Sequence, residues 1–285
     1  MSPNAARSVT VALLAASLVG YAAALGATVD ASIALGSSAG DPVMSDFEGK
    51  TFEFMGEVGK FYDVISEKDH QMTMRLKLGQ MWDHNGTYMD GIGFRYQDHK
   101  VVVELGTDDN MHVYLDGKQL RMAADENEQE HILGLESGEM MLLWQLHCPG
   151  MGQAVEITTD LLSIVVYMTP AGTRDEGGAI QPAYINFDAA LLEAPAHELK
   201  GIIGEGYSRL ASPVKPSAPK NDFKFHGDEA DYMVDGYFPA TTHILPKFNA
   251  RGFGAGGGNR RLIERAYVAF PLRFRSGSVP SALSA

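Results

Sequence analysis

Residues 71–78 alternate strictly between polar and apolar side chains, in the order Gln, Met, Thr, Met, Arg, Leu, Lys, Leu. Because successive side chains of a β-strand point to opposite faces, this period of two predicts a half-buried strand. Its buried face carries Met72, Met74, Leu76 and Leu78. A chain with such a strand needs a further layer against which this apolar face can pack.

Further short β-rich runs lie at residues 100–105, 111–115, 118–122, 140–146, 154–158, 161–168 and 183–187. Asp116 and Gly117 separate two of these runs and predict a two-residue hairpin turn, because glycine tolerates a positive φ angle. Helical periodicity is nearly absent. The pattern predicts an all-β fold, an antiparallel β-sandwich or barrel-like stack, with few or no long helices after the leader.

Residues 1–26 have the features of a secretory signal peptide. Arg7 precedes an apolar run at residues 9–25, and small residues such as Ala24 and Gly26 suit signal peptidase. A transmembrane anchor is the alternative, but Ser17 and Gly20 interrupt the run, which is shorter than the roughly 20 residues that span a bilayer. We expect cleavage before residue 32, secretion, and no transmembrane segment in the mature chain.

The chain is acidic, with a net charge of −13 and a sequence pI near 5.1. Such a protein repels DNA, RNA and anionic membranes, so nucleic acid is not an expected partner. Two acidic clusters, at residues 107–110 and 125–130, are expected to be solvated loops. Asn85, followed by Gly86 and Thr87, is the one N-x-[ST] acceptor and a candidate glycosylation site in a secreted chain.

The chain has a single cysteine, Cys148, which cannot form an internal disulfide. It follows the apolar run at residues 140–146 and is expected to be a buried small hydrophobe, with pairing to another chain as the alternative. Stability must come from packing, and about 250 mature residues are enough for a sizeable core without disulfides.

Three blocks of sequence resemble one family. They read Gly-Asp-Pro, Phe-Glu-Gly and Phe-Glu-Phe within residues 40–62; Thr-Tyr-Met-Asp-Gly-Ile-Gly-Phe at 87–94; and His-Glu-Leu-Lys-Gly-Ile-Ile-Gly-Glu-Gly-Tyr at 197–207, with Pro-Val-Lys and Ala-Asp-Tyr after it. Over residues 40–234 they are similar to the root cap and late-embryogenesis-like family, which is related to von Willebrand factor type D domains. The resemblance implies a secreted, non-catalytic β domain, with bounds that we place at residues 40–248.

The resemblance suggests calcium as a cofactor, because type D domains commonly bind it in the loop after G-L-C-G. Here Gly-Ile-Ile-Gly at residues 201–204 is followed by Glu-Gly-Tyr-Ser, which lacks the Asn and Asp pattern of that loop. We therefore expect no cofactor unless calcium binds. Its candidate oxygen ligands are Asp41, Glu205, Asn221 and Asp222.

Catalytic signatures are absent from the sequence: it contains no H-E-x-x-H, G-x-S-x-G, P-loop or C-x-x-C motif. His70, His84 and His99 lie near acidic residues and could bind a metal or transfer protons, but histidines in such polar turns are more often exposed. We expect no catalytic residues. Trp82 and Tyr88 are candidate platforms for a sugar ring, whereas Trp144 is expected in the core.

Residues 249–285 form a Gly-rich linker and a basic C-terminal tail. We expect residues 266–275 to add as a strand to a sheet edge of this chain or a neighbour. Together these features predict a secreted, non-enzymatic extracellular matrix or cell-wall protein that assembles with itself, other proteins or polysaccharide. A carbohydrate-binding or carbohydrate-modifying cell-surface protein is the alternative.

Overall fold

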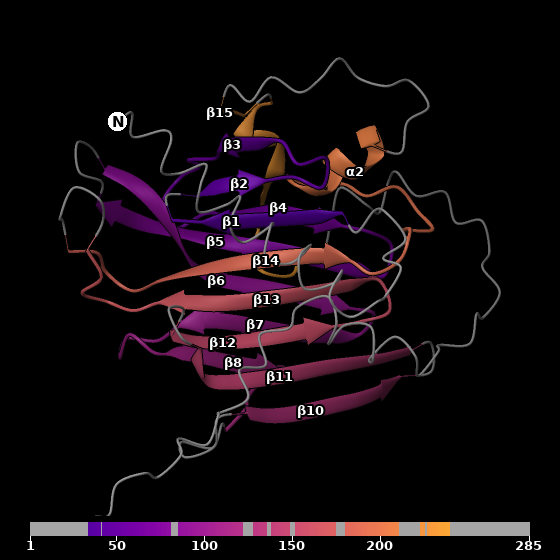
Figure 1. The fold of residues 1–285 in the computed structure, drawn as a ribbon, viewed down its shortest axis with the longest axis horizontal. Coiled ribbons are helices and arrows are strands. Elements are labelled where there is room, and N and C mark those ends of the chain that lie inside the picture. The colour runs from indigo at the N-terminus through magenta and orange to yellow at the C-terminus, as the bar shows by residue number, and fades with distance from the viewer. Residues whose placement is uncertain are drawn as a thin grey trace, which may run out of the picture.

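The computed structural model describes residues 34–40, 42–80, 85–121, 128–135, 138–148, 152–174, 180–210, 223–225 and 227–239. These residues form an all-β fold, as predicted, in which one sheet of sixteen strands curls so that two layers face each other (Figure 1). All strand pairs are antiparallel except β15 with β3. The regular helices described are one short α-helix, α2 (Gly204–Leu210), and a 3-10 turn, η1 (Glu229–Tyr232).

The front layer of Figure 1 runs in the order β10-β11-β12-β13-β14-β1-β2-β3-β15. Its strands are β10 (Glu128–Leu135), β11 (Gly138–Cys148), β12 (Gly152–Thr158), β13 (Leu162–Thr169), β14 (Tyr184–Leu191), β1 (Leu35–Ala39), β2 (Val43–Ser45), β3 (Thr51–Glu53) and β15 (Phe223–Lys224).

The back layer runs from β16 through β4, β5, β6, β7 and β8 to β9. Its strands are β16 (Met233–Val234), β4 (Phe61–Ser66), β5 (His70–Gln80), β6 (Asn85–Tyr96), β7 (His99–Leu105), β8 (Met111–Leu115) and β9 (Lys118–Gln119). The two layers join where Ile185 of β14 pairs with Met89 of β6. The predicted turn at Asp116 and Gly117 is confirmed, because both residues have positive φ angles, of 50° and 76°.

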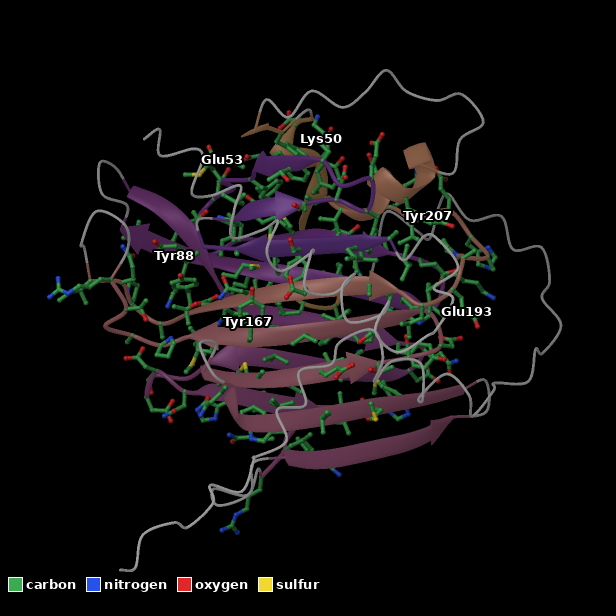
Figure 2. The ribbon with its side chains drawn as sticks, in the orientation of Figure 1. Lys50, Glu53, Tyr88, Tyr167, Glu193 and Tyr207 are labelled. Atoms are coloured by element: carbon green, nitrogen blue, oxygen red, sulfur yellow. The ribbon has the colours of Figure 1, made fainter. Side chains whose placement is uncertain are left out.

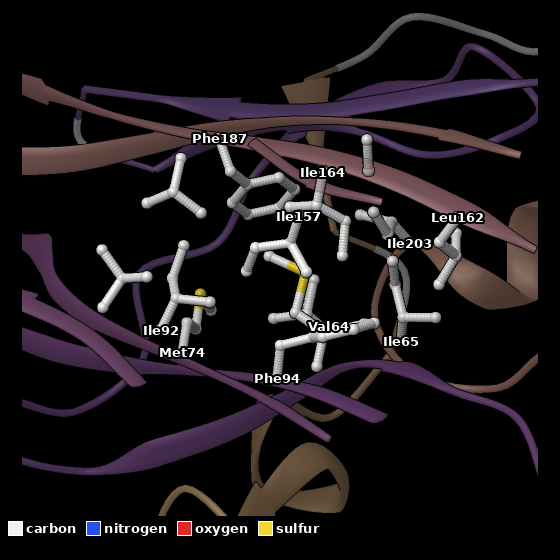
Figure 3. Close-up of a cluster of buried hydrophobic side chains, with 14 of the residues drawn as sticks. Val64, Ile65, Met74, Ile92, Phe94, Ile157, Leu162, Ile164, Phe187 and Ile203 are labelled. Carbon is white, nitrogen blue, oxygen red and sulfur yellow. The ribbon is translucent and has the colours of Figure 1, made fainter. Parts of the chain in front are cut away.

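The core lies between the two layers. Figure 3 shows Ile157, Ile164 and Phe187 of the front layer facing Met74, Ile92 and Phe94 of the back layer. Every second residue of these strands is in the core, as the period of two requires. Trp144 is 3% exposed and belongs to this core, which confirms its predicted place.

The Gly-Ile-Ile-Gly block packs along β4. Lys200 exchanges backbone hydrogen bonds with Ser66, and the Ile203 amide donates to the Val64 carbonyl at 3.1 Å. Gly201 has a φ of +93°, and a Cβ there would lie 2.6 Å from the Val64 carbonyl carbon, so glycine is required. The side chain of Ile203 therefore reaches the core, where Figure 3 shows it beside Ile65.

Three local predictions need correction. Leu78 is 58% exposed, so the buried face of β5 ends at Leu76. The acidic segment 125–130 is not wholly a loop, because β10 begins at Glu128 and pairs with β11. The residues after Gly204 form α2 rather than a loop.

Candidate functional site

A buried group of titratable side chains surrounds His70, at the start of β5. The ring is 3% exposed, and its Nδ1 lies 3.2 Å from Glu67 Oε2. Its Nε2 lies 3.1 Å from both Asp160 Oδ1 and Thr159 Oγ1, in the turn between β12 and β13. The ring also lies against Tyr96, with the ring centroids 4.6 Å apart.

The charges of this His70 cluster stabilise one another. Burial opposes the charged imidazole, but the hydrogen bonds and charges of Asp160 and Glu67 outweigh it, so the pKa of His70 is raised. Burial likewise opposes charged Glu67 and Asp160, yet hydrogen bonds from His70 lower the pKa of each carboxyl. The cluster therefore favours the imidazolium form of His70, held between two carboxylates.

A hydroxyl, an imidazole and a carboxylate in sequence are also the parts of a nucleophilic triad. Thr159, however, is 2% exposed, and its hydroxyl is already bound within the turn. That hydroxyl donates to the Leu162 carbonyl at 3.2 Å and accepts from the Leu162 amide at 3.0 Å. The hydrogen bonds of His70 to Thr159 and Asp160 therefore attach β5 of the back layer to the β12–β13 turn of the front layer.

A second buried carboxyl, Asp63 of β4, lies beside the Gly-Ile-Ile-Gly block. The Ser66 hydroxyl lies 2.6 Å and 2.7 Å from its two carboxyl oxygens. Burial raises the pKa of Asp63 to about 7 in spite of that hydrogen bond, and the charge of Glu205 adds to the rise.

Residues 227–239 form a strap across the outer face of the back layer. Glu229 accepts hydrogen bonds from the Met55 and Gly56 amides at 3.0 Å and 2.8 Å. Tyr237 lies against Gly91 and Gly93 of β6, where a Cβ would come within 1.7 Å and 2.6 Å of its side chain. The two glycines of the Gly-Ile-Gly block thus make room for Tyr237.

Arg75 of β5 holds the end of this strap. Its Nε donates to Asp90 at 2.7 Å, and its Nη1 lies 3.3 Å from Glu104. Its guanidinium carbon lies 5.5 Å from the centre of the Tyr237 ring. The arrangement is a partly exposed charge cluster that positions one tyrosine.

The candidate calcium ligands are not brought together by the described residues. Glu205 lies in the first turn of α2, where its Oε2 accepts from the Tyr232 hydroxyl at 3.2 Å. Asp41, Asn221 and Asp222 fall outside the described residues, and calcium binding through them stays a prediction. Within the described parts of the chain, no three His, Cys, Asp or Glu side chains are grouped to hold a metal ion.

Of the candidate sugar platforms, Tyr88 is 5% exposed. Its ring stacks on Tyr184 at 4.6 Å and its hydroxyl donates to Gln181 at 2.8 Å, so little of the ring face is open to a sugar. Figure 2 labels Tyr88 near the end of its strand. Trp82 lies outside the described residues, and Asn85 begins β6 with its glycosylation untested.

Histidines beside acidic residues were expected to be exposed, and His70, which is 3% exposed, contradicts that expectation. His70 is in the buried cluster, whereas His99 pairs with Asp116 at 2.7 Å in the β8–β9 hairpin, and His84 is outside the described residues. Sequence reasoning missed Glu67 and Asp160 as the partners of His70. Asp160 is 90 positions from His70, and only its place in a tight turn marked it out.

No helix among the described residues is long and apolar enough to cross a bilayer. Compared with models of known protein families, the chain matches none of them. It likewise matches no curated protein.

Proposed function

We propose that this chain is a secreted, non-enzymatic structural or interaction protein of an extracellular matrix or cell wall. The signal-peptide features of residues 1–26, the acidic composition and the three root cap-like blocks support this proposal. The described fold adds a rigid two-layer scaffold in which a buried group of titratable side chains joins the layers.

The observation that carries the proposal is the edge formed by β10. This strand is eight residues long and pairs with β11 alone among the described strands. A long edge strand presents unpaired backbone amides and carbonyls, and it accepts an extended segment of another protein or copy by strand addition. Short edge strands such as β9, of two residues, offer far less.

The test is a charge placed on this edge. Ile132→Lys puts a lysine in the middle of β10, where an edge charge opposes strand addition. Leu78→Lys is the matched control, because it places the same charge on an exposed apolar strand residue of the other layer, away from β10. We expect the secreted protein to exceed its monomer mass in size-exclusion chromatography with light scattering at high concentration, and Ile132→Lys alone to reduce that mass.

The mass measurement is repeated with and without added calcium to test whether calcium affects assembly. A separate assay measures how much protein is retained on insoluble cell-wall polysaccharide. A monomer at every concentration, with no retention on polysaccharide, would contradict the proposal. So would assembly that both lysine variants leave unchanged, because the β10 edge would then have no part in it.

A further inference from the structure

The front layer carries negative charge without any balancing cation on its main strands. The strands β1 and β10–β14 contain five carboxylates and no lysine or arginine. The carboxylates are Glu128, Glu130, Glu139, Glu156 and Asp188. A sheet of this length normally mixes both signs on a solvated face, so the composition marks a surface suited to a basic partner.

The outer face of β11–β14 is largely buried although it points away from the core. Because the even-numbered residues of β13 lie in the core, Ser163, Val165 and Tyr167 face outward. Ala190 pairs with Ser163 and is 0% exposed. Leu143 lies two strands from Val165, across Glu156 of β12, and is 2% exposed. These side chains are excluded from water although Figure 1 shows no described helix or strand in front of β11–β13.

Asp188 lies in the middle of this outer face, opposite Val165 of β13 and Ser37 of β1. Among the described residues, no donor or cation binds its carboxylate. Burial alone raises its pKa to about 6. Tyr167, labelled on β13 in Figure 2, is close enough for the charge of Asp188 to help raise the pKa of its phenol. A cation that pairs with this half-buried carboxylate would stabilise its charged form.

We propose that residues 266–275 of the same chain dock on the outer face of β11–β14, with an arginine of the segment paired to Asp188. In an extended conformation its even-numbered side chains share one face and are all apolar: Ala266, Val268, Phe270, Leu272 and Phe274. Arg273 and Arg275 lie on the opposite side of the extended segment, and their long side chains can fold around its edge to reach the Asp188 carboxylate. The segment thus matches the face in both hydrophobicity and charge.

Two features of the chain favour the face over the β10 edge for this segment. Pro271 lies in its middle and has no amide hydrogen, so the segment makes a poor strand in a hydrogen-bonded ladder. Residues 240–265 link it to the described chain and span up to about 90 Å when extended, enough to reach any part of the front layer. The inference does not rest on the proposed assembly, because it concerns a single chain.

The first test maps the contact in the full-length secreted protein. A photo-cross-linking p-benzoylphenylalanine replaces Phe274, and mass spectrometry locates the product after irradiation. Cross-links to β12, β13 or β14 within the same chain support the docking. Cross-links confined to β10, or formed only between isotopically labelled and unlabelled copies, would overturn it in favour of edge addition or exchange between molecules.

The second test uses charge. Docking protects Phe274 from chymotrypsin, so Asp188→Asn should make cleavage after Phe274 roughly fivefold faster at low salt. Asp98→Asn, which removes the same charge from an exposed turn of the back layer, should have no effect. Arg273→Gln with Arg275→Gln should act like Asp188→Asn, and combining all three should add little. Equal cleavage rates in wild type and Asp188→Asn would refute the pairing.

Discussion

The charge of His70 decides how much its cluster contributes to stability. We expect His70→Gln to reduce the free energy of unfolding by about 3 kcal/mol near pH 6, because it leaves Glu67 and Asp160 without their shared cation. His99→Gln is the control. Its pair with Asp116 is partly exposed, and its loss should cost less than about 1 kcal/mol. Urea unfolding of both variants measures the difference.

The pH dependence of this cost follows from the pKa shifts. The raised pKa of His70 means that its contribution is complete below its unfolded pKa of 6.5 and is lost as the pH rises through the folded value. The lowered pKa values of Glu67 and Asp160 mean that their contributions are lost as the pH falls below about 4. The effect of His70→Gln should therefore peak between about pH 4.5 and 6.5. An effect that stays constant from pH 5 to 9 would show that His70 is not charged in the fold.

The sequence could not have singled out the partners of His70, because Glu67 is one of several nearby acidic residues and Asp160 lies 90 positions away. Asp69 and Asp98 are its acidic neighbours in sequence and in the adjoining turn, yet the carboxylates that bind it are Glu67 and Asp160. Asp160 reaches His70 only because β12 and β13 fold over β5. Contacts between the layers of a curled sheet depend on its twist, which local residue spacing does not encode.

At the scale of elements, the strap depends on the two glycines beneath Tyr237. Gly93→Ala should destabilise the protein by roughly 1–3 kcal/mol, because its Cβ would lie 2.6 Å from the Tyr237 Cβ and crowd the Thr73 hydroxyl. That result would oppose the usual preference of a strand for alanine over glycine. In a Tyr237→Gly background, which lacks that Cβ, the same change should cost far less. Equal costs in the two backgrounds would show that Tyr237 does not lie on Gly93.

Elements with a clean local pattern were predictable, and those specified by long-range contacts were not. β8 has the predicted bounds of 111–115, because its alternation and the Asp116-Gly117 turn are both local. β10 was missed in part because the acidic run at residues 125–130 predicts a solvated loop, whereas pairing with β11 holds Glu128 and Glu130 in a strand. The strap was not predicted, since its anchor Glu229 binds backbone amides 173 and 174 positions away.

At the scale of the whole molecule, folding should not depend on the single cysteine. Cys148 ends β11 opposite Gly152, and no second cysteine exists in the chain to pair with it. We expect Cys148→Ser to lower the free energy of unfolding by at most about 1 kcal/mol, with the same urea transition in the presence and absence of reductant. A disulfide-linked dimer on a non-reducing gel, whose reduction unfolds the protein, would contradict this expectation.

The missing cations of the front layer have a practical consequence for anyone who handles the protein. No lysine or arginine occurs between Arg121 and Arg174, so trypsin can release β10–β13 only as one peptide from Met122 to Arg174. Amine-reactive labels likewise find no lysine on these strands. Peptide maps and lysine cross-links made with standard reagents will therefore sample the back layer closely and give little information on β10–β13. Proteases that cleave at aromatic or acidic residues will give shorter peptides from these strands.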